Sequence, residues 1–333
     1  MDLGFDSIGN ATIILHDRRP ILATDPWYDA PAYFGSWSLS HAIPDEQREA
    51  LENVEYVWLS HGHPDHLNMG SLPKFRDKKI LLPDHYGSRI KNDLEQQGFK
   101  VTVLRDREWV RLSERVRVQC LADNNQDAVL ICEVGDNLIV NLNDAAPDVA
   151  GWGRYIRKLV AGYPVSFLFR ASGYGDADMI NFFTEEGVRI PPNAAKKRPV
   201  GPQIKALTES YGASYFVPSS SMHRYQRTDS DWANEFTTPI DVYSGGFKSS
   251  KSQLLPPYIR YDLLRKEHTE LNPASEKGVL VDPKEFGDDW AEPLSSEEKA
   301  RATKYFKDVE HLSTAMDFVR LKNRRRGDRH PPP

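Results

Sequence analysis

Four residues that can bind metal ions lie within six positions of one another. These residues are His61, His63, Asp65 and His66. They follow the strand-like run 54–59, and alternate side chains of an extended chain point the same way, so His61 and His63 are expected to face one metal position. The chain then turns at a proline, which aims Asp65 and His66 at a second point beside the first. We therefore predict two adjacent metal positions served by one loop, with a histidine-rich surface turn as the alternative.

A dinuclear centre also needs a bridging anion and ligands from elsewhere in the chain. Asp144 follows the apolar run 138–142, and His223 follows the run 214–218 and a turn of three serines. Side chains at strand ends can reach a site built from loops at the same sheet edge, so both residues are candidate ligands. The alternatives are that Asp144 starts a turn and that His223 has a structural role.

The chemistry of the first position depends on how many ligands the protein supplies. If only His61, His63 and Asp144 bind that metal, it keeps open positions for water, dioxygen or substrate. Two histidines and a carboxylate with open positions are typical of non-haem iron, although three ligands also suit catalytic zinc. Asp25 is expected to orient a ligand by accepting the other N–H of its imidazole, with a turn before Pro26 as the alternative.

Short apolar runs between polar or proline-containing turns predict the elements that position these residues. The expected strands are 11–15, 21–24, 54–59, 79–82, 101–104, 116–121, 128–134, 138–142, 166–169 and 214–218. The expected helices are 46–53, 86–97, 201–212 and 294–323, the last with Ser295 or Ser296 as its N-cap. Residues 28–48 predict a long loop, and such loops in compact domains are usually functional. Strands in both halves, interspersed with helices, predict an α/β fold with helix layers outside two packed sheets.

Composition limits the class of protein. The 333 residues are predicted to form one domain, with a core at about 1–250 and a C-terminal elaboration at 251–333 that carries a helix and a basic tail. The sequence has neither a signal peptide nor an apolar run of ~18 residues, which predicts a cytoplasmic protein outside the membrane. A net charge of −5 argues against a nucleic-acid partner. Cys120 and Cys132 are expected to be small buried residues, not a disulfide or a metal site.

Four segments, taken together, resemble the metallo-β-lactamase superfamily. They are 9–12, 24–27, 60–67 and 143–144. Within the superfamily, residues 25–39, residues 183–186 and the spacing on to 215–218 are similar to the lactamase-fold domain of CMP-N-acetylneuraminate hydroxylases. The resemblance implies an αββα sandwich, in which two mixed sheets are flanked by helices, and a binuclear metal centre.

The resemblance also implies roles for individual residues. His61 and His63 would hold one metal, Asp65 and His66 the other; Asp144 would bridge them, and His223 would complete the second site. The third histidine of the superfamily's first site falls where this chain has the residues Asn124, Asn125 and Gln126, which become candidates for contact with a metal or a water.

A second departure concerns the source of electrons. The sialic-acid hydroxylases carry a Rieske domain, whose paired cysteine and histidine ligands these 333 residues do not supply. This weakens sialic acid as the substrate and implies an external electron donor, such as a ferredoxin and its reductase. Stand-alone members of this branch resemble the diiron monooxygenases of the platensimycin and platencin diterpenoid pathways, which implies antibiotic biosynthesis.

Three classes of function follow. We favour a non-haem diiron monooxygenase that uses two iron ions and dioxygen to hydroxylate an unactivated C–H bond of a small molecule, such as a diterpenoid natural-product intermediate. The alternative is a hydrolase with two zinc or manganese ions that acts on a lactone, phosphodiester or amide through a metal-activated water. A non-enzymatic scaffold is disfavoured by the intact ligand set.

Aromatic and cationic residues elsewhere could bind the substrate. The aromatic residues expected to wall an apolar pocket are Tyr28, Tyr33, Trp37 and Trp152. The cations expected to hold a carboxylate or phosphate of the substrate are Arg170 or Arg224. For each of these residues, a place in the core or on the surface is the alternative. No catalytic side chain is predicted beyond the metal centre itself.

Overall fold

The computed structural model describes residues 1–122, 127–145, 151–175, 183–287, 293–305 and 307. The chain divides into two compact units, 1–286 and 287–333. The predicted limits of the core, 1–250, and of the C-terminal elaboration, 251–333, stay predictions. Within the described residues, none of the helices combines the length and the apolar character that crossing a bilayer requires.

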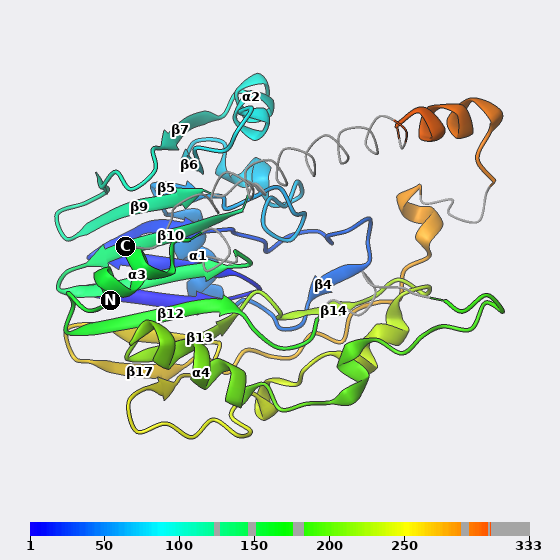
Figure 1. Ribbon diagram of the computed structural model, residues 1–333. Helices are drawn as coiled ribbons and strands as arrows, with labels where there is room; N and C mark the ends of the chain where they lie inside the picture. Colours follow the sequence, from blue (N-terminus) through cyan, green and yellow to red (C-terminus); the bar gives the residue numbers. More distant parts are fainter. Residues whose placement is uncertain (123–126, 146–150, 176–182, 288–292, 306, 308–333) are drawn as a thin grey trace, which may run out of the picture. The chain divides into compact units, whose positions relative to one another are not determined.

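Two large mixed sheets make up most of the first unit (Figure 1). The eight-stranded sheet has the order β17-β16-β1-β2-β3-β5-β6-β7. Its strands are β1 (Leu3–Ile8), β2 (Thr12–Asp17), β3 (Arg19–Thr24), β5 (Tyr56–Trp58), β6 (Lys79–Pro83), β7 (Lys100–Leu104), β16 (Ile259–Asp262) and β17 (Glu267–Glu270). The strands from β3 to β7 run parallel to one another, and the others pair antiparallel.

The second sheet has seven strands in the order β15-β13-β12-β11-β10-β9-β8. They are β8 (Val110–Arg111), β9 (Val116–Ala122), β10 (Ala128–Val134), β11 (Asn137–Asn143), β12 (Val165–Ala171), β13 (Tyr215–Ser219) and β15 (Gln253–Leu254). Here β11, β12, β13 and β15 are the parallel strands. A separate antiparallel ribbon pairs β4 (Trp37–Leu39) with β14 (His223–Tyr225).

Helices cover the outer faces of both sheets. The α-helices are α1 (Asp45–Glu52), α2 (Arg89–Gln96), α3 (Gly153–Val160) and α4 (Gly201–Tyr211). The short 3-10 helices are η1 (Leu72–Phe75), η2 (Asn193–Lys196), η3 (Asp231–Phe236), η4 (Ile240–Val242) and η5 (Pro283–Phe286). Apolar residues of α1 and α2 cluster with the eight-stranded sheet, and those of α3 and α4 cluster with the seven-stranded sheet. The predicted α/β arrangement of helix layers outside two packed sheets is therefore confirmed.

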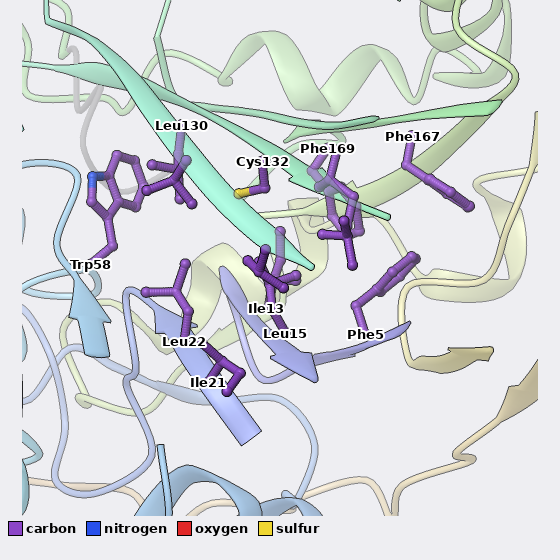
Figure 2. Close-up of a cluster of buried hydrophobic side chains, with 14 of the residues drawn as sticks. Phe5, Ile13, Leu15, Ile21, Leu22, Trp58, Leu130, Cys132, Phe167 and Phe169 are labelled. Carbon is purple, nitrogen blue, oxygen red and sulfur yellow. The ribbon is translucent and has the colours of Figure 1, made fainter. Parts of the chain in front are cut away.

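Buried apolar side chains fill the space between the sheets (Figure 2). Alternate residues of each strand enter it, such as Phe5 of β1 and Phe167 of β12, whose ring centroids are 5.0 Å apart. The intervening residues pack against helices, and because both faces of these strands are buried, they read as continuous apolar runs in the sequence. Cys120 and Cys132 are free and buried in this core, as predicted, and burial raises the pKa of both thiols.

The sequence located most elements but missed several. The segment 28–48 is not one loop, because it contains β4 and the start of α1. The strands β1, β16 and β17 were not predicted; β1 and β16 pair although they lie far apart in the sequence, and β17 is exposed throughout. In the second unit, Ser295 is the helix N-cap: its Oγ accepts from Glu298 N at 3.2 Å, and Glu298 accepts from Ser295 N at 2.8 Å. The remainder of the predicted helix 294–323 lies largely outside the described residues.

A buried ion pair fixes β16 to β1. Asp6 and Arg260 are opposite one another in the ladder. Arg260 Nε donates to Asp6 Oδ1 at 2.8 Å, and Arg260 Nη2 donates to Oδ2 at 2.9 Å. His16 Nε2 lies 3.2 Å from the same Oδ2, and Arg260 also contacts Glu46. Asp6 has no solvent-exposed surface.

Asp6→Asn is expected to lower the free energy of unfolding by about 2 kcal/mol, because the guanidinium of Arg260 loses its charged partner and keeps only Glu46. Chemical denaturation measures the change. Glu270→Gln, at an exposed position of β17, is the control and is expected to change stability by less than about 0.5 kcal/mol.

The same pair gives the stability a pH dependence. Burial alone would raise the pKa of Asp6, but hydrogen bonds from Arg260 and His16 outweigh it and hold the pKa below its ordinary value of 3.8. The stabilisation is therefore present above about pH 4 and is lost as the pH falls through the folded-state pKa. Melting curves from about pH 5 down to about pH 2 should fall more steeply for the wild type than for Asp6→Asn. Parallel curves would contradict this assignment.

Candidate metal centre

The predicted ligands lie on loops that leave the carboxyl ends of parallel strands. Asp25 follows β3, the segment 60–66 follows β5, Asp144 follows β11 and Ser220 follows β13. Parallel strands bring their carboxyl ends to one edge of a sheet. Contacts from Asn143 to Asp25 and from Ser220 to His66 show that the edges of the two sheets meet here.

The structure brings His61, His63 and Asp144 together. One ligand atom from each lies within 4.8 Å of those of the other two. His61 Nε2 is 2.8 Å from His63 Nδ1 and 3.8 Å from Asp144 Oδ2. His61 is buried and His63 is exposed. Burial, together with the neighbouring His66, lowers the pKa of His61 to about 3, so its imidazole is neutral at neutral pH, the form that binds metal.

Asp65, His66 and Asp144 form a second cluster beside the first. His66 Nε2 lies 3.2 Å from Asp65 Oδ2 and 3.4 Å from Asp144 Oδ2. The same Asp144 oxygen therefore faces both His61 and His66, which is the place of a carboxylate that bridges two cations. Ser220 Oγ holds the other oxygen of Asp144 at 2.7 Å.

The charges at the second cluster favour a cation. Burial would lower the pKa of His66, but the carboxylates of Asp65, Asp144 and Asp25 outweigh it and raise that pKa well above its ordinary value. Burial opposes ionisation of Asp65, yet His66 holds its pKa below the ordinary range. A positive charge is thus stabilised between these groups, and a metal ion could replace the proton. Imidazole and carboxylate donors suit iron, zinc and manganese, so the residues fit a two-metal centre.

The buried carboxylate of Asp25 orients the ligands. Its Oδ1 accepts from Ser60 N at 2.7 Å, and its Oδ2 accepts from Ser60 Oγ at 2.8 Å and from Asn143 Nδ2 at 2.7 Å. His66 Nδ1 lies 3.1 Å from the same Oδ2. Donation from Nδ1 to Asp25 leaves the lone pair of His66 Nε2 directed at Asp65 and Asp144. These are the contacts that the predicted orienting role of Asp25 requires, and the role itself stays a prediction.

Ser60 links Asp25 to His61 through hydrogen bonds. The hydroxyl donates its hydrogen to Asp25 and can accept two more hydrogen bonds, from Asn143 Nδ2 at 2.6 Å and from His61 Nδ1 at 2.8 Å. The lone pair of His61 Nε2 then faces His63 and Asp144. The sequence reasoning did not single out Ser60 or Asn143 for this role, although each is the chain neighbour of a predicted ligand.

Asn10 and Tyr33 hold Asp65. Asn10 Nδ2 donates to Asp65 Oδ2 at 2.9 Å, and the Tyr33 hydroxyl donates to Oδ1 at 2.9 Å. Asn10 also accepts from Met222 N at 2.8 Å, which ties the turn between β1 and β2 to the segment before β14. Tyr33, predicted to bind substrate, thus contacts a candidate ligand directly.

Four residues of this network have strained backbone conformations. Asp25, Tyr33, Asn143 and Ser220 have φ values of 40°, 48°, 52° and 58°. Each is a non-glycine residue in the left-handed region, at a cost on the order of 1 kcal/mol. The network of hydrogen bonds holds these conformations, and with them the directions of the side chains.

His223 lies near the centre but is held by other contacts. Its Nε2 is 2.6 Å from the carbonyl oxygen of Gly175, and its ring stacks on Trp37 with centroids 3.5 Å apart. Its Nδ1 is buried without a hydrogen-bond partner among the described residues. Burial lowers the pKa of His223 to about 4, while Asp65 and Asp144 act in the opposite direction. Its role as a ligand of the second metal stays a prediction.

The other predicted residues are spread across the fold. Tyr28 and Trp152 are buried in two different apolar clusters, against the helix layers of the two sheets, and Arg224 donates to the carbonyl of Glu276. Arg170 is on β12, in register with Asn143. Their part in substrate binding stays a prediction. The residues Asn124, Asn125 and Gln126 lie outside the described residues, but their neighbour Asp127 has Oδ1 3.6 Å from His61 Nδ1.

Sequence comparison relates the chain to hydroxylases. No family model matches it. It is 29% identical over 181 residues to the cytidine monophosphate-N-acetylneuraminic acid hydroxylase of Sus scrofa, across 52% of this chain and 40% of that protein. It is 35% identical over 98 residues to a Mycolicibacterium smegmatis protein that carries the name of a Rieske 2Fe-2S iron-sulfur protein, across 28% of this chain and 18% of that one. The matches thus cover less than half of either relative.

Structure comparison gives the fold. A possible metal-dependent hydrolase of Veillonella parvula superposes with a TM-score of 0.51 at 14% identity, over 81% of this chain and all of that one (100%). The isothiocyanate hydrolase from Delia radicum gut bacteria superposes with a TM-score of 0.50 at 14% identity, over 78% of this chain and 98% of the other. The predicted sandwich is confirmed: this chain has the metallo-β-lactamase fold, and in sequence it is similar to hydroxylases of CMP-N-acetylneuraminate.

Proposed function

We propose that the protein is an oxygen-dependent hydroxylase with a dinuclear non-haem iron centre. The ligands are His61, His63, Asp65, His66 and Asp144, with His223 as a further ligand of the second metal. The observation that carries the proposal is the position of Asp144 Oδ2, which faces His61 Nε2 at 3.8 Å and His66 Nε2 at 3.4 Å. One carboxylate oxygen between two sets of imidazole and carboxylate donors is an arrangement for two cations.

Two observations favour iron and oxygen chemistry over hydrolysis. The sequence likeness is to hydroxylases. In addition, the described residues offer the first metal two imidazoles and one carboxylate, a set that leaves open positions and is typical of non-haem iron. The competing function is a zinc or manganese hydrolase of a lactone, phosphodiester or amide, since the same donors bind those ions.

When bound, iron would supply the redox chemistry by which one oxygen atom of dioxygen enters a C–H bond and the other leaves as water. The two electrons would come from an external donor such as a ferredoxin and its reductase, and the two protons from solvent. The protein's residues do the rest. Asp25 and Ser60 keep both imidazoles in the ligand tautomer, and Tyr33 and Asn10 fix Asp65. Placement of the substrate beside this rigid centre decides which C–H bond reacts.

The substrate is a small organic molecule. By resemblance to stand-alone members of the branch, a diterpenoid intermediate of antibiotic biosynthesis is the substrate we propose.

Protein reconstituted with ferrous iron under anaerobic conditions is expected to contain about two iron ions per chain, because two donor clusters share Asp144. Elemental analysis after desalting measures the ratio, and oxygen uptake on addition of a reductant tests the redox activity. Binding of zinc in preference to iron, together with hydrolysis of a generic phosphodiester, would reject the hydroxylase.

His63→Ala is expected to reduce the iron content to about one ion per chain and to abolish turnover, because the first cluster loses an imidazole while the second keeps its donors. His268→Ala removes an exposed histidine of β17 and should keep both ions. Full activity in His63→Ala would remove His63 from the centre.

Asp25→Asn is expected to weaken metal binding about 10-fold to 100-fold. The amide nitrogen of asparagine cannot accept the hydrogen bonds that the carboxylate of Asp25 accepts, so His61 and His66 would no longer be held in the tautomers that bind metal. Competition with a chromophoric chelator for zinc measures the affinity. Asp29→Asn is the matched control: Asp29 lies on the same loop but pairs with Lys74 outside the centre. An unchanged zinc affinity in Asp25→Asn would show that Asp25 does not orient the ligands.

A further inference from the structure

A cavity of about 840 Å³ opens beside His61 and His63. Its walls come from the segment 61–69, which carries the candidate ligands of the loop after β5, and from helix α2, which Figure 1 shows in cyan above the strands. The volume is within the range of cavities that hold small organic ligands, about 300–1,000 Å³. None of the residues predicted from sequence to bind substrate lines it.

One side of the cavity is apolar. Leu67 and Ile90 are partly buried, and Met69 is 57% exposed although its side chain is apolar. Gly62 stands between the two histidines, and a Cβ placed there would lie 3.5 Å from Ile90 Cδ1. Ile90 therefore borders the passage to the candidate ligands. Exposed apolar side chains next to a reactive centre are suited to contact the carbon body of a ligand.

The cation at the cavity is Arg89. Its Nε lies 3.8 Å from Asp93 Oδ2, and both side chains are well exposed, at 86% and 57%. A solvent-exposed pair at this distance is weak, so the guanidinium keeps donors for another anion. The amides of Gln96 and Gln97 also line the cavity. Asp93 is the acidic residue of the lining, and it is the weakly held partner of Arg89.

We propose that the substrate combines an apolar carbon body with an anionic oxygen group. The body contacts Leu67, Met69 and Ile90, and the carboxylate or phosphate binds Arg89. This assignment rests on the proposed hydroxylase function and names its substrate class. It gives Arg89 of α2 the role that the sequence analysis assigned to Arg170 or Arg224.

The test uses zinc-loaded protein, in which the metal positions are filled but no oxidation occurs. Calorimetric titration with octanoate, octyl phosphate and octan-1-ol measures binding. Arg89→Gln is expected to weaken octanoate or octyl phosphate about fivefold to tenfold and to leave octanol unchanged, because only the anions lose a charge-assisted hydrogen bond. Whichever anion loses more identifies the group that Arg89 binds.

Two further variants complete the design. Lys91→Gln removes a cation from the same helix, where it pairs with Glu95 and does not line the cavity, and it should leave all three affinities unchanged. Ile90→Ala should weaken all three probes about threefold to fivefold through lost apolar contact. Because Arg89 and Lys91 are on the solvent side of α2, unchanged melting temperatures are expected for both charge variants.

The outcomes separate the two proposals. If the wild type fails to bind zinc, the metal centre fails, and the substrate class fails with it. If zinc binds but Arg89→Gln and Lys91→Gln weaken the anions equally, or neither does, the cavity assignment is overturned while the metal centre stands. Anion binding that is insensitive to both Arg89 and Ile90 would likewise overturn it, because the probes would then bind the metals directly.

Discussion

The carboxylate of Asp25 is the group on which the centre depends. It has no solvent-exposed surface, and an ionised carboxylate without water is costly unless its oxygens receive hydrogen bonds. Ser60, His66 and Asn143 supply them. These donors come from loops of both sheets, so one buried charge joins the sheet edges and selects the tautomers of the histidines. Asp25 therefore both links the edges of the two sheets and, in its predicted role, orients the candidate ligands.

The sheet topology explains how Asp25 can contact loops from both sheets. Because β3 and β5 are adjacent parallel strands, Asp25 and Ser60 leave the same edge of the eight-stranded sheet. Asp144 and Ser220 leave the matching edge of the other sheet, after β11 and β13. The apolar core between the sheets holds the two edges together (Figure 2). Short loops are therefore enough to bring the candidate ligands together. Strained turns at Asp25, Asn143 and Ser220 set the directions of the side chains in these loops.

The features that could be predicted from the sequence are those that depend on residues close together in the chain. Strands buried on both faces read as apolar runs, and the spacing of His61 and His63 shows their shared direction. Contacts between distant segments leave no such signal. Asp6 and Arg260 look like surface charges until the pairing of β1 and β16 brings them together over 254 positions. In the same way, nothing in the sequence places Ile90 of α2 beside Gly62, or Trp37 of β4 on the ring of His223. The cavity wall was missed for this reason.

The candidate ligands differ in their burial. Asp65 and His66 are buried, and Asn10 and Tyr33 both donate hydrogen bonds to Asp65. Burial of these two side chains strengthens the electrostatic interaction between them. His63, by contrast, is exposed and borders the cavity next to α2. In the proposed dinuclear centre, a substrate would therefore approach past His63, while the buried contacts on the other side would hold Asp65 and His66 in place.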